Sequence, residues 1–148
     1  MQPVVLFVNN LSYLSLKNTL HYRKIWLLLG IIYILLILLG SLAKIPESEI
    51  QFSGADKIIH FSMYFILVGW FSQLYEKNSS RLIILLLAML LGLLIEILQG
   101  LTAYRSFDYL DEVANSIGAI CAFLLLKTSL ASSLAIIDSW IAEKLIRE

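Results

Sequence analysis

The sequence predicts an all-α membrane protein with four transmembrane helices, both termini on the cytoplasmic side, and an amphipathic helix near the C-terminus. Hydrophobic residues make up 59% of the 148-residue chain and charged residues only 15%. A soluble domain is roughly half apolar and about a quarter charged. The apolar residues also gather into runs about as long as needed to cross roughly 30 Å of hydrocarbon. Composition and patterning therefore both indicate a membrane protein.

The first predicted span covers residues 25–43 and follows an N-terminal tail, residues 1–24, whose pattern predicts no definite structure. This span has no charged residue and is uniformly apolar all round, so we interpret it as an anchor. The second span covers residues 56–75. In it Asp56, His60 and Tyr64 recur at i, i+4 and i+8, which places them on one helix face near its start.

The third and fourth spans, residues 82–101 and about 111–126, each carry a stripe of small and polar residues. The third has Ala88, Gly92, Glu96, Gln99 and Ala103 on one face. The fourth has Asp108, Asp111, Asn115, Gly118 and Ala122. Because small residues let another helix approach closely, both stripes predict packed faces.

The C-terminal segment, residues 127–148, has apolar residues at helical spacing. They are Leu130, Leu134, Ile137, Ile141 and Leu145. Asp138 and Lys144 lie opposite this face, so the pattern fits an amphipathic helix on the membrane surface. It fits a terminal helix packed on the bundle equally well.

The distribution of Lys and Arg predicts the orientation. Cytoplasmic loops of membrane proteins are enriched in these residues. With the N-terminus inside, the inner segments hold eight of the eleven Lys and Arg residues. The outer loops hold the other three, Lys44, Lys57 and Arg105. We therefore expect a multi-pass protein of the bacterial inner membrane, with cytoplasmic tails at residues 1–24 and 127–148.

This topology brings polar residues of three spans to one depth near the outer surface. The candidate ligand-binding residues are His60, Tyr64, Glu96, Gln99, Arg105, Asp108, Asp111 and Asn115. A carboxylate in the apolar region costs roughly 2.5–3.5 kcal/mol on insertion scales, so such groups face the bundle and find partners. Arg105, His60 and Gln99 are the candidate partners of Glu96.

Each of these residues also has a purely structural interpretation. Gln99 and Asn115 are of the type that forms hydrogen bonds between helices. Asp108 stands where a carboxylate caps a helix start, and this is the interpretation we favour for it. If the whole set is structural, it only fixes the register of a helix bundle or homo-oligomer.

Catalysis is an open question, whereas several other function classes are disfavoured. His60, Glu96 and Asp111 are the candidate acid–base groups. One histidine with Glu96 and Asp111 offers donors for a divalent cation, but no ligand motif such as HExxH is present, so we predict no metal and no cofactor. The net charge is zero, and no basic stripe points to nucleic acid.

The polar residues resemble the VanZ-like family of small bacterial membrane proteins. The matching pieces are Asp56-Lys57-Ile-Ile-His60-Phe61-x-x-Tyr64, Glu96-x-x-Gln99 and Arg105-Ser-Phe-Asp108-x-x-Asp111-x-x-x-Asn115-x-x-Gly118. The resemblance runs from about residue 56 to 126, and the tails lie outside it. Ala122 departs from the family pattern, where a second glycine is expected, and this change predicts a wider contact in the last helix.

The resemblance implies a four-helix membrane domain at residues 25–126 and a role in the cell envelope, since the family is named for a protein of teicoplanin resistance. It does not imply a reaction. The first hypothesis is an outer-facing site for an envelope lipid, a lipid-linked cell-wall precursor or a glycopeptide. The second is a membrane-embedded enzyme in which His60 or Glu96 acts on a lipid-linked substrate, and the third is a structural bundle.

Overall fold

The computed structural model describes residues 17, 19–44, 54–126 and 132–147, and these form five α-helices and no β-strand. The helices are α2 (Arg23–Leu42), α3 (Ala55–Leu74), α4 (Asn78–Gly100), α5 (Tyr109–Leu125) and α6 (Ser133–Ile146). The prediction of an all-helical chain is therefore confirmed. The largest shift in a boundary is at α4, which begins four residues before the predicted start because the polar residues 78–81 form its first turn.

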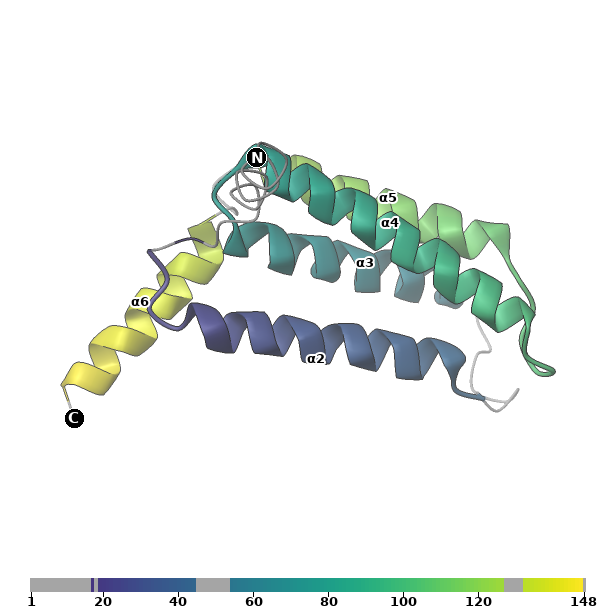
Figure 1. Cartoon of the computed structure of the whole chain (residues 1–148), viewed down its shortest axis with the longest axis horizontal. Coiled ribbons are helices and arrows are strands. Elements are labelled where there is room, and N and C mark those ends of the chain that lie inside the picture. The colour runs from purple at the N-terminus through teal and green to yellow at the C-terminus, as the bar shows by residue number, and fades with distance from the viewer. Residues whose placement is uncertain (1–16, 18, 45–53, 127–131, 148) are drawn as a thin grey trace, which may run out of the picture.

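Helices α2 to α5 alternate in direction along one bundle (Figure 1). As a result, the end of α2, the start of α3, the end of α4 and the start of α5 meet at the same end of the molecule. Helix α3 packs against each of the other three. The polar residues that the sequence places at these four helix ends are thus gathered by topology.

Small residues set how closely α3 and α5 approach. A Cβ atom built on Gly118 would collide with the backbone carbonyl of Phe61, so only glycine fits at that crossing. Further along, a Cβ on Gly69 would lie 4.0 Å from the Cβ of Ala122, which is buried. Gly69 on α3 therefore provides the space that a second glycine on α5 would have given, and Ala122 does not widen the contact.

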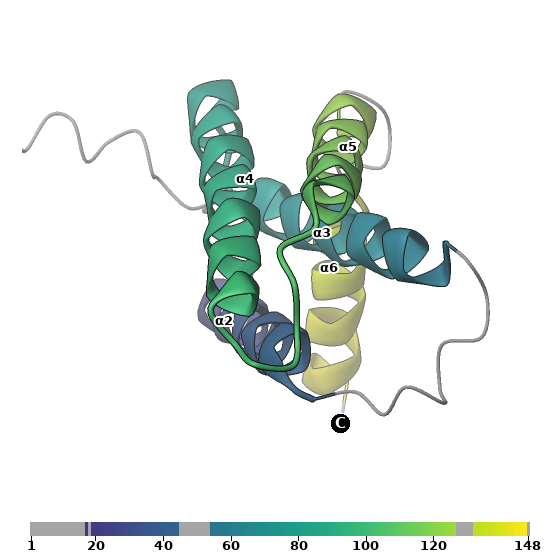
Figure 2. The same cartoon turned by 90° about the vertical axis from the view of Figure 1, so that its right-hand side faces the viewer.

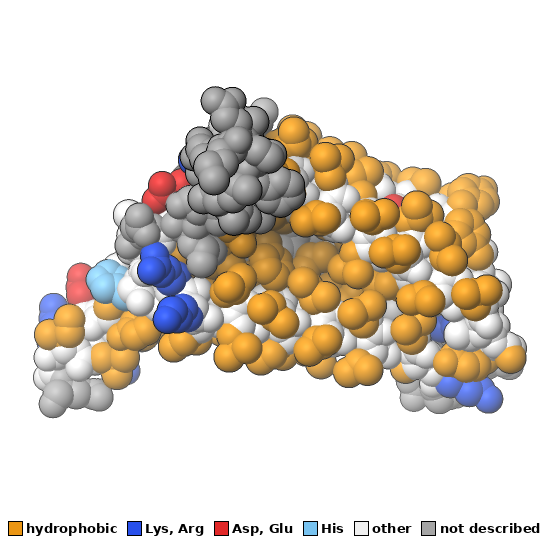
Figure 3. All heavy atoms as spheres, viewed as in Figure 1, with side chains coloured by type: hydrophobic (Ala, Val, Ile, Leu, Met, Phe, Trp, Pro, Cys, Tyr) orange, Lys and Arg blue, Asp and Glu red, His pale blue; other side chains and the backbone are white. Residues whose placement is uncertain are grey.

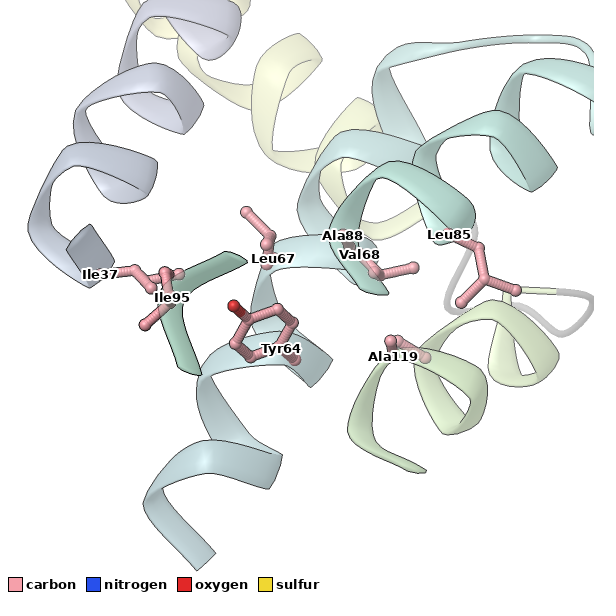
Figure 4. Packing of buried hydrophobic residues seen from close by; sticks show 9 residues of the cluster. Ile37, Tyr64, Leu67, Val68, Leu85, Ala88, Ile95 and Ala119 are labelled. Atoms are coloured by element: carbon pink, nitrogen blue, oxygen red, sulfur yellow. The ribbon is translucent and has the colours of Figure 1, made fainter. Parts of the chain in front are cut away.

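The hydrophobic core lies in the middle of the bundle, below the polar end. Tyr64, Leu67 and Val68 of α3 pack against Ile95 of α4 and Ala119 of α5 (Figure 4). Each is exposed by 3% or less. The core fixes the relative rotation of α3, α4 and α5, and through them the positions of the polar side chains at the bundle end.

Two helices, α2 and α4, are long and apolar enough to cross a membrane, each with a mean hydropathy of 2.7. Apolar side chains cover the middle of the molecule, and charged ones lie toward its two ends (Figure 3). Helices α3 and α5 do not meet this criterion, so it supports two of the four predicted spans. Helix α5 has only 17 residues, and α3 carries Asp56, Lys57 and His60 in its first two turns.

Helix α6 packs on the opposite end of the bundle through a face that differs from the predicted one. Its buried residues are Leu134, Asp138 and Ala142, whereas Ile137 is 49% exposed. The prediction that placed Asp138 on the polar side is wrong, because its carboxylate has partners at the start of α2. It accepts hydrogen bonds from the backbone N–H groups of His21 and Tyr22, at 2.6 and 3.0 Å.

Candidate functional site

The site lies at the end of the bundle that Figure 2 shows from the front, where the α4–α5 connection passes over the end of α2. Side chains of α4 and this connection hold the last carbonyls of α2, which have no partner within their own helix. Gln99 Nε2 donates to Ser41 O at 2.7 Å and Tyr104 Oη to Leu42 O at 2.8 Å. These bonds fix the connection over the bundle end.

Lys57 joins the start of α3 to the start of α5. Its Nζ atom donates to Asp108 Oδ2 at 2.5 Å and also contacts Asp111 Oδ1. Asp56 Oδ2 is a third carboxylate oxygen near this ammonium group, at 3.6 Å. Because the three carboxylates come from two helices, Lys57 offsets the repulsion that would otherwise push α3 and α5 apart.

Asp108 has the capping role predicted from the sequence. It is the N-cap of α5, and its Oδ1 atom accepts a hydrogen bond from the Leu110 N–H at 2.8 Å. Hydrogen bonds from Lys57 and from this backbone N–H hold the pKa of Asp108 below its usual range. Asp108 therefore stays ionised and keeps Lys57 at the pocket wall.

His60 lies below Lys57 and is 4% exposed. Its Nδ1 atom is 3.1 Å from Asn115 Oδ1. Its Nε2 atom points between two carboxylates, at 3.7 Å from both Asp56 Oδ1 and Asp111 Oδ2. On the far side, Asn115 Nδ2 donates to Glu112 Oε2 at 3.3 Å. A row of polar side chains thus runs from α5 through His60 to the carboxylates at the surface.

Glu96 is fully buried and has a partner that the sequence did not suggest. Its Oε2 atom accepts the Asp108 backbone N–H at 3.2 Å, so the end of α4 holds the start of α5. Its Oε1 atom has no hydrogen-bond partner among the described residues. Arg105 is not its partner, because the guanidinium reaches Ala43 O on the rim at 3.5 Å.

A polar cavity of about 510 Å³ opens above this network. It is lined by Asp56, Gln99, Ala103, Tyr104, Arg105, Ser106, Asp108 and Asp111. This volume is within the range of small-molecule pockets. Four of the eight predicted binding residues therefore line the cavity, namely Gln99, Arg105, Asp108 and Asp111.

The other four predicted residues lie deeper in the bundle. His60, Asn115 and Glu96 form a buried layer beneath the cavity floor, and Tyr64 belongs to the hydrophobic core. Arg105 and Asp111 share the cavity, but His60 and Glu96 do not line it. The predicted site is thus divided into a pocket and a buried support.

Sequence reasoning left three residues out of the site: Asp56, Lys57 and Glu112. The signal for Lys57 was available, since it stands beside Asp56 at a helix start that the topology places opposite Asp108 and Asp111. The signal for Glu112 was also available, since it lies four residues after Asp108 and three before Asn115, which places it beside the polar stripe. It turns inward because Gly92 leaves room: a Cβ there would lie 2.5 Å from Glu112 Oε2.

The described part of the chain is an all-helical bundle with a polar pocket at one end, and two of its helices are long and apolar enough to cross a membrane, which suggests a membrane protein. The chain belongs to the VanZ/LLP1 family, whose model matches residues 4–132. This match is wider than the predicted resemblance at residues 56–126 and includes most of the N-terminal segment, which we had placed outside it.

One relative is Uncharacterized protein C11E3.10 of the fission yeast Schizosaccharomyces pombe, 32% identical over 115 residues. The alignment covers 76% of this chain and 70% of the relative. The family is therefore not confined to bacteria. No solved structure matches the chain.

Proposed function

We propose that this protein is a four-span membrane protein whose end pocket binds the headgroup of a membrane lipid. The observation that carries the proposal is the polar cavity of about 510 Å³ at one end of a bundle whose sides are apolar. A headgroup lies at the depth where such a pocket would open. The acyl chains of the same lipid would run along the apolar sides of α2 and α4.

The four-span arrangement rests on α3 and α5 in addition to the two apolar helices. Both run antiparallel to their neighbours through the same bundle (Figure 1). Their charged residues lie at the pocket end, and their outward-facing surfaces carry exposed apolar side chains, as at Ile58, Ile59 and Ile117. Both termini would then lie on the cytoplasmic side of the cytoplasmic membrane, and the pocket would face outward, as the distribution of Lys and Arg favours.

The charges of the pocket favour a headgroup with a phosphate and hydrogen-bond donors. Arg105 is on the rim, and its guanidinium makes one hydrogen bond among the described residues, to Ala43 O. Its remaining donors can bind a phosphate in a forked geometry. Asp56, Asp108 and Asp111 across the cavity would accept bonds from hydroxyl or ammonium groups. The fungal relative favours a common phospholipid over a peptidoglycan precursor or a glycopeptide, because fungal walls contain no peptidoglycan.

Photo-crosslinking tests this proposal. Purified protein would be labelled with a phosphatidylethanolamine analogue and, in parallel, with an undecaprenyl-linked cell-wall precursor. We expect the first probe to label the wild type and Arg147→Ala, a matched control with an exposed arginine on α6, and to label Arg105→Ala weakly. Equal labelling of all three would refute the role of Arg105. Selective labelling by the second probe would replace the phospholipid with a wall precursor.

A second candidate is a membrane-embedded enzyme in which His60 is the base. The observation that favours it is the direction of His60 Nε2, which faces two carboxylates just below the cavity. The same geometry argues against Glu96 as the acid–base group, because Glu96 holds the Asp108 backbone and does not reach the cavity. A lipid extract that is the same in wild-type and deletion cells would count against an enzyme and leave lipid binding intact.

A further inference from the structure

Three side chains, two at the cavity floor and one just beneath it, bring possible ligand atoms close together. They are His60, through Nε2, and one carboxylate oxygen each of Asp56 and Asp111. These residues can each offer a ligand atom such that all three atoms lie within 4.8 Å of one another. The His60 side chain is only 6% exposed, and its Nε2 atom is 3.7 Å from both oxygens, beyond hydrogen-bond distance.

The buried hydrogen bonds determine which ring nitrogen of His60 faces these carboxylates. Both carboxylate oxygens of Glu112 accept hydrogen bonds, from Asn115 Nδ2 and Ser116 Oγ, so the Asn115 oxygen faces His60. That oxygen only accepts, so His60 Nδ1 carries the hydrogen. The other ring nitrogen, His60 Nε2, faces the two carboxylate oxygens of Asp56 and Asp111.

One metal ion placed between Nε2 and the two carboxylate oxygens would bind all three atoms. Ligand atoms about 2.1 Å from a tetrahedral zinc ion lie roughly 3.4 Å apart; the two nitrogen–oxygen pairs are 3.7 Å apart, and all three atoms lie within 4.8 Å, so small side-chain shifts would bring them to a zinc ion. A histidine whose second ring nitrogen is held by a polar group is also the usual form of a metal ligand. Asn115 supplies that polar group here.

Lys57 does not fill this position. It contacts the other oxygen of each carboxylate, Asp56 Oδ2 and Asp111 Oδ1, and lies on the opposite side from His60. Each carboxylate therefore has one oxygen near the Lys57 ammonium group and its other oxygen near His60, where a metal ion would bind. Asp56 and Asp111 also line the cavity, which gives an ion a route of entry.

We propose that Asp56, His60 and Asp111 bind one divalent transition-metal ion, with zinc as the best match to one imidazole and two carboxylates. Three protein ligands leave a fourth position open toward the cavity, as in sites where the metal also binds a further ligand. This replaces the expectation of no metal that the sequence motifs gave. The inference stands whether or not the pocket binds a lipid, because it rests on the three side chains and their support.

Zinc binding to the purified full-length chain, measured by competition with a chromophoric chelator, tests the proposal. We expect one zinc ion per chain in the wild type. Replacing a supporting residue of a metal ligand lowers affinity about 10- to 100-fold. We expect Asn115→Ala to fall in that range and His60→Ala to lose about 100-fold or more. The chain has two histidines, so His21→Ala is the matched control and should bind as the wild type does.

Two further variants keep the test decisive if His60→Ala fails to fold. Asp56→Asn changes a half-buried group at the cavity and should fold but bind zinc weakly. Lys57→Met removes a competing positive charge and should bind zinc at least as tightly as the wild type. The proposal is overturned if the wild type binds no tighter than Asp56→Asn, or if His21→Ala loses binding to the same extent as the ligand variants.

Discussion

Substitution of Gly118 by alanine is the perturbation that best tests how the site is assembled. A Cβ atom at this position would meet the Phe61 carbonyl oxygen, with the Phe61 Cα at 3.1 Å. All of these contacts are backbone atoms of α3, which cannot rotate out of the way. Helices α3 and α5 would therefore have to separate, and the His60–Asn115 and Lys57–Asp111 contacts would lengthen with them.

The chain supplies a matched control for the size of the effect. Gly40 on α2 has no atom within 4 Å of a built Cβ, so Gly40→Ala gains only helix propensity. That gain is at most about 1 kcal/mol, whereas overpacking costs about 1–3 kcal/mol. Gly118→Ala gains the same helix propensity, so the free energies of unfolding of the two variants should differ by the overpacking cost alone, about 1–3 kcal/mol. Gly92→Ala should fall between them, because its obstacle is the Glu112 side chain, which can move.

Thermal unfolding in detergent, followed by circular dichroism, measures this series. We expect the order of stability Gly40→Ala, wild type, Gly92→Ala, Gly118→Ala. A Gly118→Ala variant as stable as Gly40→Ala would show that the close crossing of α3 and α5 does not hold the polar residues together.

Three other predictions concern the buried polar groups. Burial by itself would raise the pKa of Asp138. Hydrogen bonds from the Trp26 side chain and from the backbone N–H groups of His21 and Tyr22 outweigh this effect and hold the pKa below its usual range. Asp138 therefore stabilises the fold above the unfolded pKa of about 4 and loses this effect as pH falls through the folded pKa. Unfolding of Asp138→Asn should show a weaker loss of stability between about pH 4 and 2 than unfolding of the wild type. Gln99→Leu should lower the free energy of unfolding by about 1–3 kcal/mol, because Ser41 O loses its buried donor; equal denaturation midpoints would contradict this. Glu96→Gln keeps an acceptor for the Asp108 N–H and should leave the melting temperature nearly unchanged, so a large drop would show that the charge itself is required.

The sequence predicted the helices and the polar end because both follow from local patterns. Runs of apolar residues and helical spacing placed four helices within a few residues of their true ends. Stripes at i, i+4 and i+7 correctly placed Glu96, Asp111 and Asn115 on buried faces. The alternation of direction then required these faces to meet at one end.

The partners within the site did not follow from the sequence, because they depend on rotations and side-chain reach that spacing does not determine. The candidate partners of Glu96 were Arg105, His60 and Gln99, yet it holds the Asp108 backbone. Asp138 was expected in water, yet it is buried against the start of α2. In both cases a carboxylate binds backbone N–H groups of another element, which no side-chain motif reveals.

The central claim is that the pocket is open to water on the outer side of the membrane, and cysteine labelling tests it most directly. The one native cysteine, Cys121, would be replaced by alanine. Ser106→Cys would then mark the cavity lining and Ser139→Cys the exposed side of α6 at the other end. In intact cells, an impermeant thiol reagent should label position 106 at once and position 139 only after permeabilisation. Labelling of position 139 alone, or of neither before permeabilisation, would contradict the account.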